Sequence, residues 1–70
     1  MTNKTKLEIA NKLKTYRLKA GLSQAGLAEL AGVNTNAYAK IERGESEPTL
    51  STIKLLSKAL EVKASDILGY

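Results

Sequence analysis

The chain has no cysteine and no histidine among its 70 residues, and these absences exclude several kinds of protein. Without cysteine there is no disulfide framework, and without either residue a zinc site lacks its usual ligands. A glycine-rich phosphate-binding loop is also missing. We therefore expect no enzyme, no metal, no cofactor and no bound small-molecule ligand.

Long hydrophobic runs are absent as well. No apolar segment approaches the roughly eighteen residues that a membrane-spanning helix needs. The first twelve residues carry charges but lack the apolar core of a signal peptide. We therefore expect a cytoplasmic protein that makes no contact with a membrane.

Aromatic residues and proline are scarce. The chain has three tyrosines, no phenylalanine, no tryptophan and one proline, and its β-branched residues do not alternate with polar ones as in a strand. Apolar residues instead recur at intervals of three and four, which predicts an all-α fold. We expect a single domain over residues 1–70, a compact bundle of five short helices. These helices are expected near residues 5–20, 24–31, 35–43, 50–60 and 64–68.

Several residues mark the ends of the expected helices. Ser23, Asn34 and Thr49 are placed to cap the second, third and fourth helices, since their side chains accept hydrogen bonds from free backbone amides. Gly32 follows the second helix, where a left-handed backbone is easiest without a Cβ. The apolar stripes turn the following residues toward the core: Leu7, Ile9, Ala10, Leu13, Tyr16, Arg17, Ala20, Leu27, Leu30, Ala31, Val33, Tyr38, Ile41, Leu50, Ile53, Leu56, Leu60, Ile67 and Leu68.

The balance of charge favours a nucleic-acid partner, although weakly by itself. Eleven Lys and Arg against seven Asp and Glu give a net charge of +4. The charges are unevenly distributed along the chain. Glu42, Glu45 and Glu47 cluster at the end of the most informative segment and beyond it, while the basic residues that precede this segment are Lys4, Lys6, Lys12, Lys14, Arg17 and Lys19. These glutamates could suggest a catalytic carboxylate pair, but a polar loop after a helix accounts for them more simply.

The most informative segment is residues 23–44, which predict two short helices joined by a tight turn. Tyr38 and Ile41 lie three residues apart on the inward face of the second of these helices. Its outer face consists of Thr35, Asn36, Ala39 and Lys40. Because that face holds no acid, it can enter a DNA major groove without bringing a carboxylate to phosphate.

The same segment resembles the helix-turn-helix of the Cro and lambda-type repressors, the XRE-like family of bacterial and phage regulators. The motifs that carry the resemblance are Leu22-Ser23-Gln24, Leu27-Ala28, Gly32-Val33-Asn34, Ile41-Glu42-Arg43-Gly44, Glu47-Pro48-Thr49 and Ala59-Leu60-Glu61-Val62. The similarity covers roughly residues 7–68. It implies a five-helix, lambda-repressor-like DNA-binding domain, encoded by a bacterium or a phage, in which helices two and three form the helix-turn-helix.

The resemblance also assigns roles to polar residues. The positions that match the base-reading residues of the family are Thr35, Asn36 and Lys40. The positions expected to contact DNA phosphates are Ser23, Gln24, Asn34, Tyr38 and Arg43. Two assignments stay open. Lys40 can reach a phosphate instead of a base, and the pattern alone is equally consistent with Gln24 as a solvated helix residue. Family members with this pattern hold a largely buried ion pair at the positions of Arg17 and Glu42.

Three positions depart from the family pattern. Tyr38 stands where an aliphatic residue is usual, and we expect its ring in the core and its hydroxyl at the rim. Gly26 interrupts the second helix, at a cost of about 1 kcal/mol relative to alanine. Lys63 stands where the family prefers a capping Ser or Thr.

The expected function is that of a sequence-specific regulator of transcription that binds double-stranded DNA, and a Cro-sized repressor in particular. Family proteins generally act as two-fold dimers on palindromic operators, so we expect a homodimer at least on DNA. The expected dimer contact is the loop before the fourth helix together with Ile67, Leu68 and Tyr70. Two alternatives stay open. One is an antitoxin-type protein-interaction module with secondary DNA binding, and the other is an activator that presents Glu45 and Glu47 to polymerase.

Overall fold

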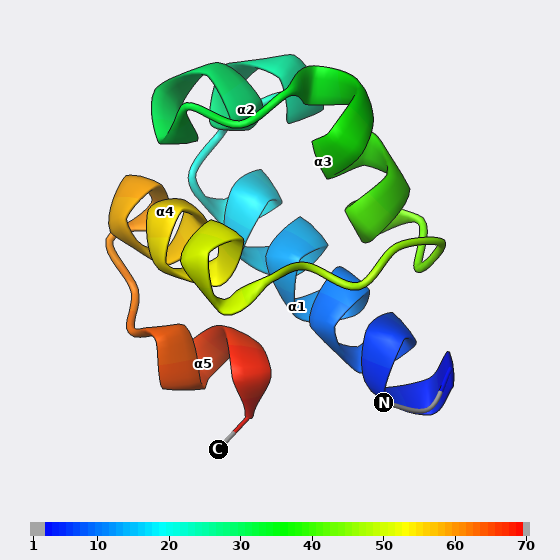
Figure 1. Cartoon of the computed structure of the whole chain (residues 1–70). Coiled ribbons are helices and arrows are strands. Elements are labelled where there is room, and N and C mark those ends of the chain that lie inside the picture. The colour runs from blue at the N-terminus through cyan, green and yellow to red at the C-terminus, as the bar shows by residue number, and fades with distance from the viewer. Residues whose placement is uncertain (1–2, 70) are drawn as a thin grey trace.

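The structure, a computed structural model, describes residues 3–69 and the side chains from Thr5 onward. This part of the chain contains five helices and no strand, which confirms the all-α prediction (Figure 1). The helices are α1 (Asn3–Lys19), α2 (Gln24–Ala31), α3 (Thr35–Glu42), α4 (Leu50–Leu60) and α5 (Ala64–Leu68). None of them is long and apolar enough to cross a membrane.

The predicted caps begin the three middle helices. Ser23 Oγ accepts a hydrogen bond from the Gly26 amide at 2.9 Å, and Asn34 Oδ1 accepts one from the Ala37 amide at 3.0 Å. Thr49 Oγ1 accepts one from the Thr52 amide at 3.1 Å. Each bond satisfies an amide that the helix itself leaves free.

The start of α5 uses a different solution, because the Lys63 side chain has no acceptor atom. Asp66 Oδ2 instead accepts a hydrogen bond from the Lys63 backbone amide at 2.9 Å. The helix therefore begins at Ala64, as predicted, with the cap supplied from inside the helix.

Gly32 ends α2 and sets the direction in which the chain enters α3. Its φ of 75° is left-handed, and the next residue, Val33, donates its amide to the Ala28 carbonyl at 2.8 Å. A side chain at position 32 would be strained in this conformation. Glu61, which follows the last residue of α4, also adopts a left-handed backbone conformation, with φ 57°, although it is not glycine.

The five helices enclose one cluster of buried side chains. Helix α1 packs against α3 and α5, α2 packs against α3 and α4, and α4 packs against α5. The cluster consists of Ile9, Leu13, Leu27, Ala28, Ala31, Tyr38, Ile41, Ile53, Leu56, Leu60 and Ile67. Ala28 is fully buried, and its small side chain allows the close approach of α2 to its neighbours.

Four predicted core positions are wrong. Leu7, Leu30 and Leu50 are 51%, 62% and 58% exposed, and Ala20 is also exposed. At about 100° per residue, Leu30 lies roughly 160° around α2 from buried Ala28, so it faces away from the core. Ala20 lies beyond the last residue of α1, and Leu50 is the first residue of α4. The spacing of apolar residues at intervals of three and four therefore predicted wider buried faces than these helices have.

Candidate nucleic-acid interface

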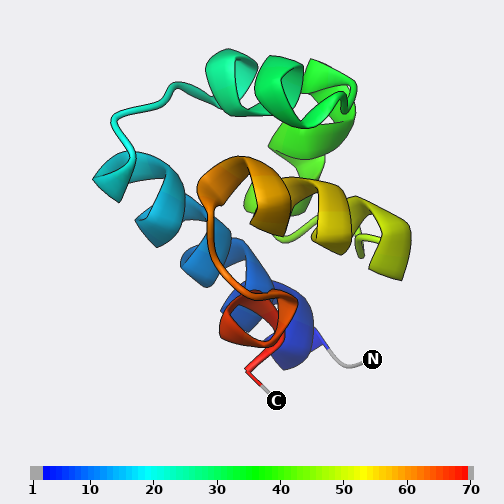
Figure 2. The same ribbon diagram turned by 90° about the vertical axis from the view of Figure 1, so that its left-hand side faces the viewer.

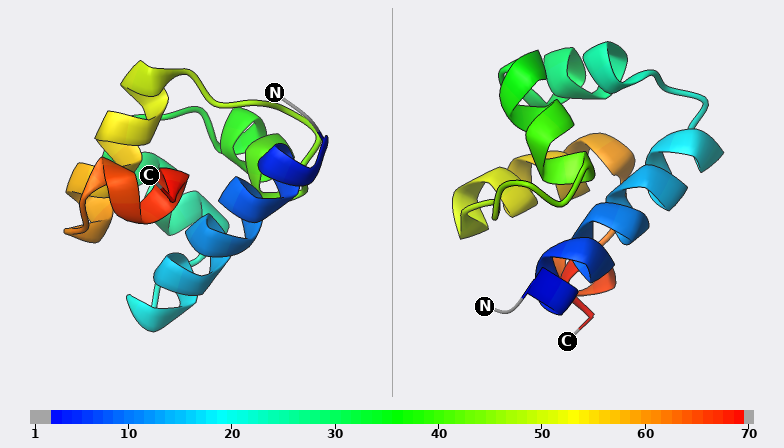
Figure 3. Two further views of the ribbon diagram at one scale, coloured as in Figure 1. Left: turned by 90° about the horizontal axis from the view of Figure 1, so that it is seen from below. Right: turned by 90° about the vertical axis from the view of Figure 1, so that its right-hand side faces the viewer.

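Helices α2 and α3 lie at one end of the molecule, and α5 lies at the opposite end (Figures 1 and 2). The right-hand view of Figure 3 shows the same arrangement, with α2 and α3 at the upper end and α5 at the lower end beside the first turns of α1. Thr35, Asn36 and Lys40 on α3 are all exposed. The three residues matched to base reading therefore share an open helix face that no other described element covers.

The only carboxylate of α3, that of Glu42, is turned away from this face into a bidentate ion pair with Arg17. Arg17 Nε donates to Glu42 Oε2 at 2.9 Å, and Nη2 donates to Oε1 at 2.7 Å. The third nitrogen, Nη1, donates to the Leu22 carbonyl at 2.8 Å. The two side chains are only 10% and 4% exposed. One guanidinium thus joins α1, the α1–α2 connection and α3 at the positions where the sequence predicted a pair.

This pairing changes the acidity of both groups. The hydrogen bond with Glu42 raises the pKa of Arg17. Burial alone would raise the pKa of Glu42, but the hydrogen bonds from Arg17, with its positive charge, hold that pKa below its ordinary value. Glu42 is therefore a charged group in the folded protein, although it is nearly inaccessible to solvent.

Tyr38 does not reach the surface. It is 0% exposed, and its hydroxyl has no hydrogen-bond partner among the described residues. Burial raises the pKa of Tyr38, and the nearby carboxylate of Glu42, one helical turn away, raises it further. The expected phosphate contact of Tyr38 is therefore wrong, because the ring places its hydroxyl inward, beside the Arg17–Glu42 pair, rather than at the rim.

Gln24 has a partner that the sequence did not indicate. Its Nε2 donates to Glu42 Oε1 at 3.2 Å, which links the first residue of α2 to the last residue of α3. Gln24 itself is partly buried. The contact joins residues 18 positions apart whose types are ordinary at helix ends, so no local pattern could have revealed it.

Ser23 and Asn34 are exposed residues at the starts of α2 and α3. Each uses its side-chain oxygen as a helix cap. The Ser23 hydroxyl hydrogen and the Asn34 side-chain NH2 group are donors that these caps do not consume. Both residues therefore keep a donor for a DNA phosphate while they hold their helices.

Arg43, directly after α3, forms an exposed ion pair that was also not predicted. Its Nε donates to Glu45 Oε2 at 2.6 Å, and the two side chains are 52% and 55% exposed. Glu45 raises the pKa of Arg43 by this hydrogen bond, and Arg43 lowers the pKa of Glu45 by the same bond. In water such a pair is weak, so Arg43 can leave Glu45 for a phosphate.

Some of the residues expected at a dimer contact are buried in the structure, and others are exposed. Ile67 is 0% exposed and belongs to the core, so the expectation that it contacts a second subunit is wrong. Leu68 is partly buried, and Glu45 and Glu47 in the loop before α4 are exposed. Tyr70 lies outside the described residues.

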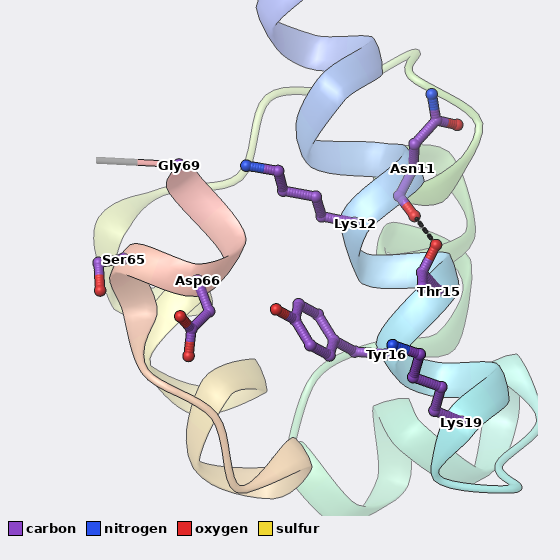
Figure 4. Close-up of a pocket in the computed structure, with 8 residues that line it drawn as sticks. All are labelled: Asn11, Lys12, Thr15, Tyr16, Lys19, Ser65, Asp66 and Gly69. Carbon is purple, nitrogen blue, oxygen red and sulfur yellow. Dashed lines mark hydrogen bonds between the residues drawn. The ribbon is translucent and has the colours of Figure 1, made fainter.

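A groove of about 480 Å³ lies between α1 and α5 (Figure 4). In it Tyr16 points from α1 toward Asp66, and Lys12 extends toward Gly69. The Lys19 ammonium lies 5.9 Å from the centre of the Tyr16 ring. None of the residues that line the groove belongs to α2 or α3, and the groove carries charges of both signs, so it is separate from the polar face described above.

The comparison with known proteins places the chain in a family. A family model described as helix-turn-helix, HTH_3, matches residues 13–67. The chain belongs to the HTH_3 helix-turn-helix family. This is a family of DNA-binding regulators of transcription rather than of enzymes, as the resemblance implied.

The relatives include control proteins and a phage repressor. The chain is 37% identical over 60 residues to the control protein C.SmaI of Serratia marcescens, covering 86% of this chain and 71% of that protein. It is 35% identical over 71 residues to the control protein C.BamHI of Bacillus amyloliquefaciens, covering 100% of this chain and 88% of that protein. It is 33% identical over 63 residues to the immunity repressor of Bacillus phage phi105, covering 90% of this chain and 44% of that protein.

Solved structures agree on the fold. An HTH_3 family transcriptional regulator from Vibrio cholerae superposes with a TM-score of 0.89 at 39% identity, covering 96% of this chain but only 38% of that one. The restriction-modification controller protein C.AhdI from Aeromonas hydrophila superposes with a TM-score of 0.86 at 29% identity, covering 89% of this chain and 94% of that one. The lambda-repressor-like fold expected from the sequence is thereby confirmed.

Proposed function

We propose that this protein is a sequence-specific repressor of transcription that binds a palindromic operator in double-stranded DNA as a two-fold dimer. One observation carries the proposal. The outer face of α3 exposes Thr35, Asn36 and Lys40, while the only carboxylate of that helix is buried against Arg17. A helix with polar donors and no exposed acid on one face suits the major groove.

The proposed base contacts follow from side-chain chemistry. Asn36 pairs two hydrogen bonds with an adenine edge, and the Thr35 methyl group packs against a thymine methyl. Lys40, one turn further along α3, donates to guanine acceptors or to a nearby phosphate. Thr35 and Asn36 lie at the start of α3, where a recognition helix commonly contacts base edges.

The proposed phosphate contacts surround this face. Ser23, Gln24 and Asn34 offer neutral donors at the starts of α2 and α3, where free backbone amides also favour an anion. Arg43 offers a charge at the other end of α3, once it leaves Glu45. These contacts hold the protein on the duplex without selecting a sequence.

A dimer is proposed because one domain of this size contacts too few base pairs for high specificity. The available contact surface is the loop between α3 and α4 with Leu68, since Ile67 is buried. We favour repression over activation as the sign of regulation. The phage repressor relative agrees with repression.

A selection from random double-stranded DNA tests the proposal, followed by footprinting on the recovered sequence. We expect an inverted repeat whose half-site centres lie about 34 Å apart, and protection of both half-sites on one face of the duplex. Recovery of no preferred sequence would contradict sequence-specific binding. Protection of a single half-site by one chain per duplex would contradict the dimer and favour an antitoxin-type interaction module.

A further inference from the structure

The carboxylate of Glu42 accepts hydrogen bonds from donors on two other helices, α1 and α2. Its Oε1 accepts hydrogen bonds from Arg17 Nη2 at 2.7 Å and from Gln24 Nε2 at 3.2 Å. Its Oε2 accepts one from Arg17 Nε at 2.9 Å. The Arg17 bonds account for the stability of the pair, but they leave unexplained why a partly buried glutamine at the start of α2 points at the same oxygen.

The contact with Glu42 determines the orientation of the Gln24 side-chain amide. A carboxylate only accepts hydrogen bonds, so the NH2 group of Gln24, and not its oxygen, must face Glu42. One N–H is then used by Glu42, and the second N–H of the same group stays free. A glutamine without this anchor would sample many rotamers and both amide orientations.

We propose that Glu42 is a positioning residue for Gln24, one that holds the free N–H of the glutamine ready to donate to a DNA phosphate. The inference rests on the proposed phosphate contact of Gln24. Glu42 itself would touch no DNA, because its side chain is only 4% exposed. Arg17 makes the arrangement possible by neutralising a carboxylate that would otherwise repel the phosphate.

This arrangement connects the two helices of the motif through a side chain that faces the interior. Glu42 is the last residue of the base-reading helix, and Gln24 is the first residue of α2. The carboxylate of Glu42 therefore fixes the position of the proposed phosphate contact on α2 relative to the base-reading helix α3. Loss of that carboxylate should weaken DNA binding through Gln24 while base preference is unchanged.

The test compares the effect of Gln24→Ala in two backgrounds, the wild type and the double variant Arg17→Met/Glu42→Leu. The double variant removes the acceptor but leaves no unpaired buried charge, and such apolar replacements are often tolerated. Dissociation constants are measured on the selected operator at one salt concentration, by fluorescence anisotropy. The matched control is Asn36→Ala, at the opposite end of α3, in the same two backgrounds.

In the wild-type background Gln24→Ala should weaken binding about tenfold, as expected for one charge-assisted hydrogen bond. In the double variant it should weaken binding less than about twofold, because the glutamine is no longer held. Asn36→Ala should cost the same factor in both backgrounds. An equal loss for Gln24→Ala in both backgrounds would overturn the inference.

Two other results are separable. If Gln24→Ala has no effect in the wild type while Asn36→Ala weakens binding, the positioning role fails and the proposed function stands. If no duplex is bound specifically, the proposed function fails and the positioning role fails with it.

A spectroscopic measurement on the wild type covers the case in which the double variant does not fold. The Gln24 side-chain amide should show one hydrogen-bonded, slowly exchanging N–H proton in the free protein, and the second proton should shift on addition of operator DNA. Two freely exchanging protons in the absence of DNA would overturn the inference.

Discussion

Arg17 on α1 and Glu42 on α3 face each other in a fork-to-fork pair, with hydrogen bonds of 2.9 and 2.7 Å, that is almost sealed from solvent. The pair joins the longest helix of the bundle to the helix that we propose reads DNA. Its first consequence concerns stability rather than binding, because a buried charge that loses its partner is costly.

Arg17→Ala should lower the free energy of unfolding by about 3–5 kcal/mol, since it leaves the Glu42 carboxylate buried and unpaired. Urea unfolding of the free protein measures this change. Lys14→Ala removes an exposed cation from the same helix and should change stability little. An Arg17→Ala protein with wild-type stability and poor DNA affinity would show that Arg17 serves the DNA and not Glu42.

Acid should remove the contribution of the pair. The pKa of Glu42 is lower in the folded protein than its ordinary value, and a glutamate in an unfolded chain has a pKa of about 4.3. The pair therefore stabilises the fold fully above this value and loses its effect as the pH falls through the folded-state pKa. The difference in unfolding free energy between the wild type and Glu42→Gln should be large at pH 7 and should shrink below about pH 4.

The control for the acid experiment is Glu8→Gln, which changes an exposed glutamate on α1. Its difference from the wild type should be small at every pH. A wild-type advantage over Glu42→Gln that stays constant from pH 7 to pH 3 would contradict the assigned charge state of Glu42.

Tyr38→Phe should be tolerated. The Tyr38 hydroxyl is buried without a hydrogen-bond partner, so its removal loses no bond and relieves a desolvation cost. We expect a free energy of unfolding equal to that of the wild type or higher by up to about 1 kcal/mol. Operator affinity and its salt dependence should be unchanged. A weaker complex of normal stability would mean that the hydroxyl reaches DNA after all.

Substitutions of Arg43 and of Glu45 should change DNA affinity in opposite directions. Arg43→Ala should weaken binding to all sequences and flatten the log–log salt dependence by about 0.9, as for one lost phosphate contact. Glu45→Gln should strengthen binding to all sequences, because it frees Arg43 and removes a carboxylate near the duplex. The control is Glu61→Gln, which changes the exposed glutamate that follows the last residue of α4. A Glu45→Gln protein with unchanged or weaker binding would contradict this account of the pair.

The sequence predicted those features of the fold that depend on neighbouring residues. Ser23, Asn34 and Thr49 cap their helices as expected, because a cap needs only a side-chain oxygen three residues before a free amide. Gly32 adopts the expected left-handed conformation for an equally local reason. Leu30 was misplaced because burial depends on how far a partner helix extends around α2, which the local spacing does not contain.

The site was predicted less completely than the fold. The Arg17–Glu42 pair came from a family resemblance and not from the spacing of the two residues. The hydrogen bond of Gln24 to Glu42 and the inward turn of Tyr38 depend on the angle between α2 and α3. That angle results from packing across the whole core, so neither feature has a signature in the residues themselves.

We propose that the exposed face of α3 selects the DNA sequence, and the base preference of Asn36→Ala tests this proposal. The variant should bind the wild-type operator about 1–3 kcal/mol more weakly and should lose discrimination at one base pair of each half-site. Asn11→Ala, an exposed asparagine on α1, should keep the wild-type preference. An Asn36→Ala protein that selects the same sequence with the same stringency would contradict the account.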